Sequence, residues 1–260
     1  MKILSRNIIL VILLFLLTSI QSTIYPAKKD GSPTSKGIEM YVKQNQSKFI
    51  REYQDLVKDT LYDVYMSTDD LSQYTDNEDD NNLGFCFSEK GSSEIIITNE
   101  EKFMAYEVSM LSKYQKRNII ESNTFVKGTI FHELTHLYFN QVILEMRMDS
   151  MLVYPEYNNF SMVPRNYFGS KFIEEGICMY VAIKIGECIL GKDYIPETME
   201  EIVDNQNKYS IKYRYSAQYV KSFLDYYGIK RGMQIFIGNK PPSFEEILYP
   251  AKFYSRLKTR

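Results

Sequence analysis

Both histidines of this 260-residue chain lie in one pentapeptide, residues 132–136, with the sequence HELTH. This is the H-E-x-x-H pattern, and it falls within a predicted helix. The apolar residues at 130, 131, 134, 137 and 138 would bury the rest of that helix. Residues four positions apart project from the same face of a helix, about 6 Å apart, so His132 and His136 can bind one Zn²⁺ ion together. The alternative is that the two histidines only pack in the core or cap a helix. In that case the only two histidines of the chain would have fallen into this pattern by chance. The sequence therefore predicts a zinc centre on a helix.

Glu133 lies beside the two histidines, where it would face the open position of the metal. Zinc lowers the pKa of a bound water molecule to about 7 and polarises a substrate carbonyl. A carboxylate at this place can accept the proton of the attacking water. We therefore expect Glu133 to act as the general base.

A catalytic zinc ion takes three protein ligands, and the chain has no third histidine. The longer metzincin pattern, H-E-x-x-H-x-x-G-x-x-H, is excluded because Phe139 and Val142 occupy its Gly and last His positions. The third ligand must therefore be a carboxylate further along the chain.

Three downstream carboxylates are candidates for this ligand. Glu156 follows a proline in an irregular segment, where no helix would direct it. Glu174 and Glu175 lie on a predicted helix next to Gly176, which lets a neighbouring element approach, and an acidic pair on an apolar helix is costly to bury without a partner. The alternative for this pair is a solvated helix start stabilised by the helix dipole. Periodicity does not choose between Glu174 and Glu175.

Residues 172–180, with the sequence FIEEGICMY, resemble a motif of the gluzincin peptidases, in particular the peptidase MA-like group. Members pair H-E-x-x-H with a second helix of the form aromatic-x-x-E-G-x-small-x-Tyr. The resemblance implies that Glu175 is the third zinc ligand and that Glu174 supports the site. It places Cys178 at the small position of the motif.

A later phrase resembles the same family, in which a Tyr precedes an aromatic-Val pair and a terminal Tyr-Gly. Here these positions are held by Tyr213, by residues 219–220 and by residues 227–228. In the family the leading Tyr donates its hydroxyl to the oxyanion formed during attack, a role that suits a phenol near zinc. The resemblance thus implies this role for Tyr213, with Tyr215 as the alternative.

The resemblance covers roughly residues 120–250 and implies a zinc-dependent peptidase that acts on a peptide or protein substrate. The chain lacks the G-x-M-E-N-type amine site of aminopeptidases, which favours an endopeptidase. The interval of thirty-nine residues from His136 to Glu175 is longer than in the shortest members and implies an insertion. Two alternatives are a catalytically inactive zincin-like binding domain at the cell surface and a membrane-anchored structural protein. The retained Glu133 favours the enzyme.

The expected fold is α+β and zincin-like, one domain over residues 28–260 with a small N-terminal mixed sheet, an active-site helix and a mostly helical C-terminal half. A strand at residues 94–99 is the expected edge strand for pairing with substrate. The pattern predicts a hairpin of 83–88 and 94–99 and an irregular connection at 147–169. Helices are expected at 50–64, where an apolar stripe recurs, at 100–116, from 122 or 123 to about 146, at 170–190 and at 219–227. A capping box at 243–246 opens a further helix.

The N-terminus has the layout of a signal peptide. Lys2 and Arg6 precede ten apolar residues, 8–17, and polar residues follow. The run is shorter than the about 20 residues of a spanning helix. We expect cleavage after Ala27 and a secreted or extracytoplasmic protein, with membrane attachment only if this segment stays uncleaved.

The distribution of charge argues against one class of partner. Lys and Arg number 31 against 33 Asp and Glu and are scattered along the chain, so a nucleic-acid partner is not expected.

The chain has three cysteines, Cys86, Cys178 and Cys188, which cannot all pair within one chain. Cys178 and Cys188 are ten residues apart on one predicted helix, too far apart for a disulfide. Buried free thiols are the simpler expectation, and one disulfide that involves Cys86 is the alternative.

Overall fold

A computed structural model of the chain describes residues 36–62, 64–68, 84–89, 92–97, 123–157, 167–190 and 215–257. The signal segment at 1–27, the helix expected at 100–116 and Tyr213 lie outside these ranges. The helices are α2 (Lys36–Val57), α4 (Asn123–Met148), α5 (Tyr167–Leu190), α7 (Ser216–Tyr227), α8 (Ile229–Ile237), α9 (Phe244–Leu248) and α10 (Pro250–Arg256), with a 3-10 turn η2 (Pro155–Tyr157). The strands are β1 (Val64–Thr68), β2 (Gly84–Glu89) and β3 (Ser92–Ile97).

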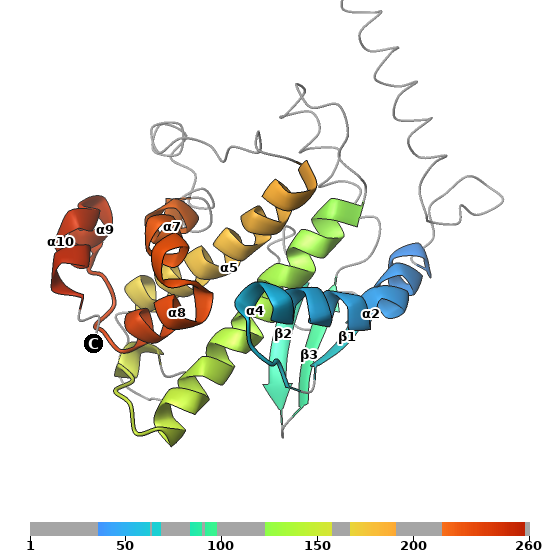
Figure 1. Ribbon diagram of the computed structural model, residues 1–260, viewed down its shortest axis with the longest axis horizontal. Helices are drawn as coiled ribbons and strands as arrows, with labels where there is room; N and C mark the ends of the chain where they lie inside the picture. The colour runs from blue at the N-terminus through green and yellow to red at the C-terminus, as the bar shows by residue number, and fades with distance from the viewer. Residues whose placement is uncertain are drawn as a thin grey trace, which may run out of the picture.

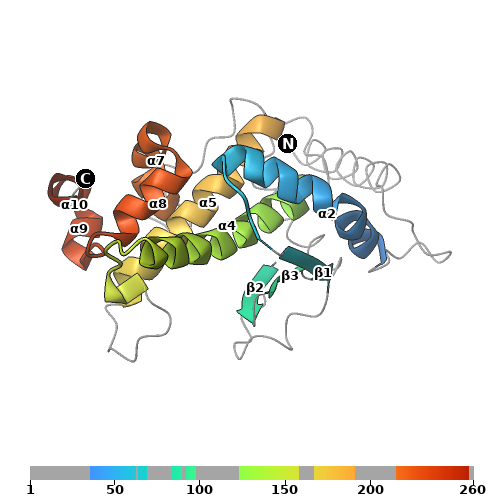
Figure 2. The ribbon, with the colours of Figure 1, turned by 60° about the horizontal axis from the view of Figure 1, so that its bottom comes forward.

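Helix α4 runs through the middle of the molecule, between the sheet and the C-terminal helices, as Figures 1 and 2 show. It is apolar on nearly all sides, which is the composition of a helix buried by neighbours all around it. Buried side chains include all five apolar residues that flank the two histidines: Ile130, Phe131, Leu134, Leu137 and Tyr138. The prediction that this surface buries the helix is confirmed.

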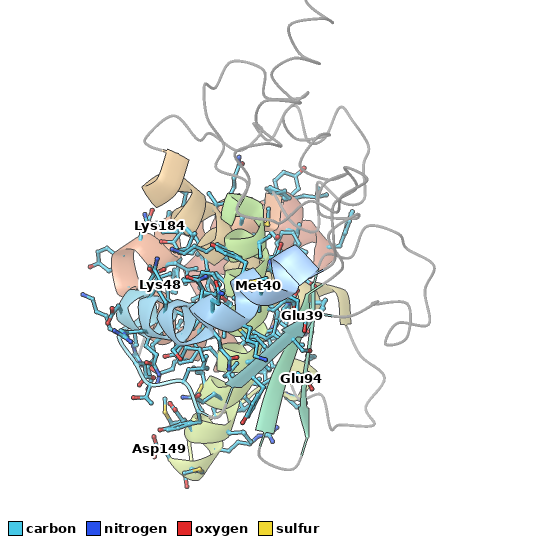
Figure 3. All side chains as sticks on the ribbon, turned by 90° about the vertical axis from the view of Figure 1, so that its right-hand side faces the viewer. Glu39, Met40, Lys48, Glu94, Asp149 and Lys184 are labelled. Carbon is cyan, nitrogen blue, oxygen red and sulfur yellow. The ribbon has the colours of Figure 1, made fainter. Side chains whose placement is uncertain are left out.

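Helix α2 covers part of α4 and the sheet with one apolar face. That face comprises Val42, Phe49, Tyr53 and Val57, all buried, while Met40 and Lys48 are exposed to solvent (Figure 3). The helix ends at Val57, and Lys58 takes a left-handed φ of 57°. The predicted helical stripe through residue 64 is therefore wrong at its end. Val64 begins a strand instead.

The sheet has the order β1-β3-β2, with β1 parallel and β2 antiparallel to β3. The predicted hairpin and the small mixed sheet are thus confirmed, and the α+β class holds. Strand β3, however, lies in the centre of the sheet, so the expectation that residues 94–99 form a free edge is wrong. Among the described strands, β1 and β2 are the edges, and β2 passes next to α4, where Gly84 approaches Glu133.

The C-terminal half packs α5 between α4 and α7. Gly176 makes this contact close: a β-carbon there would lie 2.6 Å from the carbonyl oxygen of Ser216 on α7. The predicted start of α5 at Ser170 is three residues late, since the helix begins at Tyr167. Gly169, expected in the irregular connection, is a helix residue whose missing side chain leaves room for the Pro242 carbonyl.

Local sequence signals account for two boundaries among the remaining C-terminal helices. Gly228, with a φ of 77°, ends α7, and Ser243 and Glu246 form the predicted capping box of α9. Helix α8 was not foreseen, because it follows α7 with only Gly228 between them. In the part of the chain that the structure describes, no helix is both long and apolar enough to span a membrane.

Candidate metal centre

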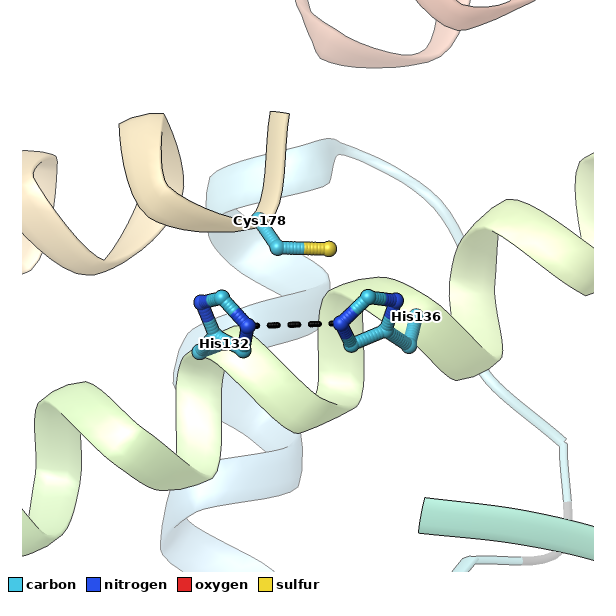
Figure 4. Close-up of side chains that lie close together, drawn as sticks. All are labelled: His132, His136 and Cys178. Carbon is cyan, nitrogen blue, oxygen red and sulfur yellow. Dashed lines mark hydrogen bonds between the residues drawn. The ribbon is translucent and has the colours of Figure 1, made fainter. Parts of the chain in front are cut away.

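The two histidines project side by side from the middle of α4 (Figure 4). Their Nε2 atoms lie 3.3 Å apart, and the ring planes are inclined by 72°. Only 14% of the His132 side chain and 10% of the His136 side chain are exposed. The i, i+4 spacing on a helix has therefore brought the two ring nitrogens together in a largely buried place, as the sequence predicts.

Glu175 on α5 brings its carboxylate to both of these nitrogens. Its Oε2 atom lies 3.3 Å from Nε2 of His132 and 3.6 Å from Nε2 of His136. Three ligands of a tetrahedral zinc ion, at bond lengths of about 2.0–2.2 Å, are roughly 3.3–3.5 Å from one another. The three donor atoms thus have the spacing that a zinc ion requires.

Glu174 contacts the same site from the outer side of His136. Its Oε1 lies 2.6 Å from Nδ1 of His136, an arrangement that fixes the ring and leaves Nε2 for a metal. Lys171, one turn earlier on α5, reaches both carboxylates, at 3.4 Å from Oε2 of Glu174 and 3.5 Å from Oε1 of Glu175. The acidic pair is therefore partnered rather than solvated, so the solvated helix start is excluded.

The neighbouring charges set the protonation of these groups. Burial alone would lower the pKa of His136, but its interactions with Cys178 and with the carboxylates of Glu174 and Glu175 outweigh burial and raise this pKa well above its ordinary value. Burial alone would raise the pKa of Glu175, but the charge of His136 and hydrogen bonds from both histidines hold it well below its usual range. The same negative charge that attracts a proton to His136 attracts a metal cation.

Cys178 also belongs to this cluster. His132, His136 and Cys178 each offer a ligand atom, all within 4.8 Å of one another, and together form a buried group that could hold a metal ion. Cys178 and Cys86 are free thiols, as expected. The side chain of Cys188 is not described.

Glu133 lies next to the histidines in a narrow gap between α4 and the start of β2. A β-carbon at Gly84 would be 2.8 Å from Cγ and 3.0 Å from Oε1 of Glu133, and 2.8 Å from Cγ2 of Thr129. Strand β2 can run this close to Glu133 because Gly84 has no side chain. Glu133 itself is buried.

Two buried hydroxyl groups, those of Thr135 and Tyr53, connect the H-E-x-x-H segment of α4 to α2. Thr135, inside the H-E-x-x-H sequence, donates to the Phe131 carbonyl at 2.6 Å, and Tyr53 of α2 donates to Thr135 Oγ1 at 3.2 Å. Both residues are fully buried. The first helix of the described chain thereby fixes the rotation of α4 at the site.

Two other candidates have different surroundings. Glu156 lies on the η2 turn, outside the two helices that carry the cluster. Tyr215 is buried and donates its hydroxyl to the Ile247 carbonyl, so its only donor is already used. Tyr213, the other candidate for the oxyanion role, lies outside the described residues.

Sequence reasoning missed the contributions of Lys171 and Gly84 and did not consider Cys178 as a ligand. The helical spacing of Lys171, three and four residues before the carboxylates, was a readable signal. The approach of Gly84 depends on the packing of β2 against α4, and the sequence carries no local sign of it.

Comparison of the chain with protein-family models, with curated proteins and with solved structures gives no match. The geometry of the cluster therefore stands as the main support for any functional assignment.

Proposed function

We propose that the protein is a zinc-dependent metallopeptidase, with His132, His136 and Glu175 as the zinc ligands. The observation that carries the proposal is the triangle of donor atoms, with sides of 3.3, 3.3 and 3.6 Å, which suits one zinc ion. The gluzincin-like motif at residues 172–180 supports Glu175 in this role. A zincin-like fold is part of the same proposal.

Each side chain of the site has a distinct task. Bound zinc supplies Lewis acidity, which polarises the scissile carbonyl and lowers the pKa of water. Glu133 accepts the proton of the attacking water and passes it to the leaving amine. Tyr213 donates its hydroxyl to the oxyanion. Glu174 and Lys171 keep His136 and Glu175 oriented.

The substrate in this proposal is an extended peptide, cut internally. Strand β2 pairs with β3 on one side, and β3 is its single partner among the described strands. Its first residue, Gly84, passes directly by Glu133. A peptide that adds to the outer edge of β2 would form main-chain hydrogen bonds and carry its scissile bond to the general base.

We further propose that the enzyme works outside the cytoplasm. The support is the charged and apolar pattern of residues 1–27, which is typical of an export signal. The N-terminal residue of the exported protein would distinguish a released enzyme, which begins near residue 28, from one anchored by an uncleaved segment.

The test combines elemental analysis of the purified protein with a peptide-library assay of the wild type and of Glu133→Gln. We expect about one zinc per chain in both proteins and a fall in turnover of at least about 100-fold in the variant. Unchanged hydrolysis by Glu133→Gln would refute the mechanism. Zinc without hydrolysis of any peptide would support the binding domain instead, and absence of zinc after reconstitution would remove the proposed site.

A further inference from the structure

Cys178 directs a sulfur atom at the two histidines from the opposite helix. Its side chain is completely buried on α5, and Figure 4 shows Sγ pointing into the space next to both imidazoles. The ligand atoms of His132, His136 and Cys178 all lie within 4.8 Å of one another. The position of the sulfur atom, and not only the presence of a cysteine in the sequence, therefore places Cys178 among the possible metal ligands.

Helix geometry explains how α5 presents two donors to one place. Glu175 and Cys178 are three residues apart, so they share a helix face, just as His132 and His136 share a face of α4. The two facing helices thereby place the Cys178 thiol near both imidazoles and the Glu175 carboxylate near the same two rings. All are zinc ligands, with a Zn–S bond of about 2.3 Å.

The simpler role for a buried free cysteine is that of a small apolar side chain. Such a residue fills space among hydrocarbon groups. Cys178 instead shares its surroundings with His136, Glu174 and Glu175, all of which interact with it electrostatically. Packing alone needs only apolar neighbours, whereas Cys178 hydrogen-bonds an imidazole that is itself a candidate metal ligand.

We infer that Cys178 is a fourth protein ligand of the metal and closes the site in its resting state. This inference rests on the proposed zinc site. On binding, a sulfur–metal bond forms and the thiol proton leaves to solvent, with no oxidation. A catalytic zinc ion keeps one position open, whereas four protein ligands characterise a closed site. Water therefore has access to the metal only when the thiolate has left.

The inference predicts opposite effects for two substitutions on the same helix face. Cys178→Ala removes the fourth ligand and leaves the three donors of the proposed catalytic site, so hydrolysis increases. Glu175→Ala removes a ligand that the catalytic site needs, so hydrolysis is lost.

Cobalt replacement tests the sulfur ligand without relying on activity. The full-length protein is stripped of metal, loaded with one equivalent of Co²⁺ and examined by absorption spectroscopy, with circular dichroism as a check of folding. We expect a sulfur-to-cobalt charge-transfer band in the near ultraviolet for the wild type and for Cys86→Ser. The band is lost in Cys178→Ala and in Cys178→Ser.

The outcomes separate this inference from the proposed function. Stoichiometric Co²⁺ binding without the sulfur band, or with a band that persists in Cys178→Ala, overturns the fourth ligand and leaves the His132, His136 and Glu175 site intact. A band that disappears in Cys86→Ser also overturns it. Absence of Co²⁺ binding in the folded wild type overturns both.

Discussion

Oε1 of Glu174 lies 2.6 Å from Nδ1 of His136, on the side of the ring opposite the donor cluster. This contact determines which nitrogen of His136 carries the proton and therefore which one is available to a metal. This is a second contact between α5 and α4, in addition to the contact of Glu175 with the two histidines. The two neighbouring carboxylates thus contact different atoms, since Glu175 faces both Nε2 atoms and Glu174 faces Nδ1 of His136.

Replacement of Glu174 by Gln is expected to weaken zinc binding by roughly 10–100-fold, because an amide is a poorer acceptor for the Nδ1 proton of His136. Competition with a chromophoric chelator measures this change. The matched control is Glu156→Gln, on the η2 turn, for which we expect wild-type affinity. Equal affinities of all three proteins would show that the contact has no orienting role.

Removal of the third ligand should have a larger effect than loss of its neighbour. Glu175→Ala is expected to lose more zinc affinity than the roughly 10–100-fold of an outer partner, because one of three donor atoms is gone. The same chelator assay applies, with Glu156→Ala as the control. If Glu156→Ala released zinc more readily than Glu175→Ala, the third ligand would lie in the loop and our assignment would be wrong.

Gly84→Ala is expected to reduce kcat by up to about 100-fold while zinc stays bound, because the new β-carbon would displace the Glu133 carboxylate. Steady-state kinetics with a cleaved peptide, together with zinc analysis, measure both properties. Gly128→Ala on α4 is the control, since a β-carbon there meets nothing within 4 Å. That change should stabilise the helix by about 0.5–1 kcal/mol and leave kcat unaltered.

The two candidate tyrosines should respond differently to loss of the hydroxyl. Tyr213→Phe is expected to lower kcat by roughly 100-fold or more with little change in stability, as for other oxyanion donors. Tyr215→Phe leaves the buried Ile247 carbonyl unsatisfied and should cost about 1–3 kcal/mol of unfolding free energy, with kcat retained. Chemical denaturation and kinetics on both variants check this, and a reversed pattern would transfer the catalytic role to Tyr215.

Acid should weaken the C-terminal helices through Glu246. The Arg256 guanidinium, which bonds both of its carboxylate oxygens, lowers the pKa of Glu246 to about 2 from its usual 4.5. Because the folded-state pKa is the lower one, the stabilisation is complete above the unfolded value of 4.5 and is lost as the pH falls through about 2.

Thermal unfolding between pH 6 and pH 2 measures this loss, which we place at about 1 kcal/mol because the pair is partly solvated. Glu246→Gln removes the ionisable group, so its stability should fall less steeply over the same range. A parallel decline of the two proteins would mean that other carboxylates dominate the acid response.

Local signals in the sequence predicted the elements whose boundaries depend on nearby residues. The capping box at Ser243, the terminating Gly228 and the hairpin of β2 and β3 all follow from interactions within a few residues. The apolar flanks of the H-E-x-x-H segment likewise predicted a buried helix. The prediction was wrong where a residue distant in the sequence determines the local structure. Val64 fits the apolar spacing of a helix, but it pairs with Ser93 in a parallel sheet and belongs to a strand.

The sequence alone determined the pair of histidines, since an i, i+4 spacing on a helix places them together whatever the rest of the fold does. The absence of another histidine also led us to expect a carboxylate as the third ligand. Only the tertiary structure decided that Glu175 meets both Nε2 atoms, that Glu174 bonds Nδ1 of His136, and that Cys178 joins them. Those relationships depend on how α5 is rotated against α4, and that rotation is set by packing between residues far apart in the chain.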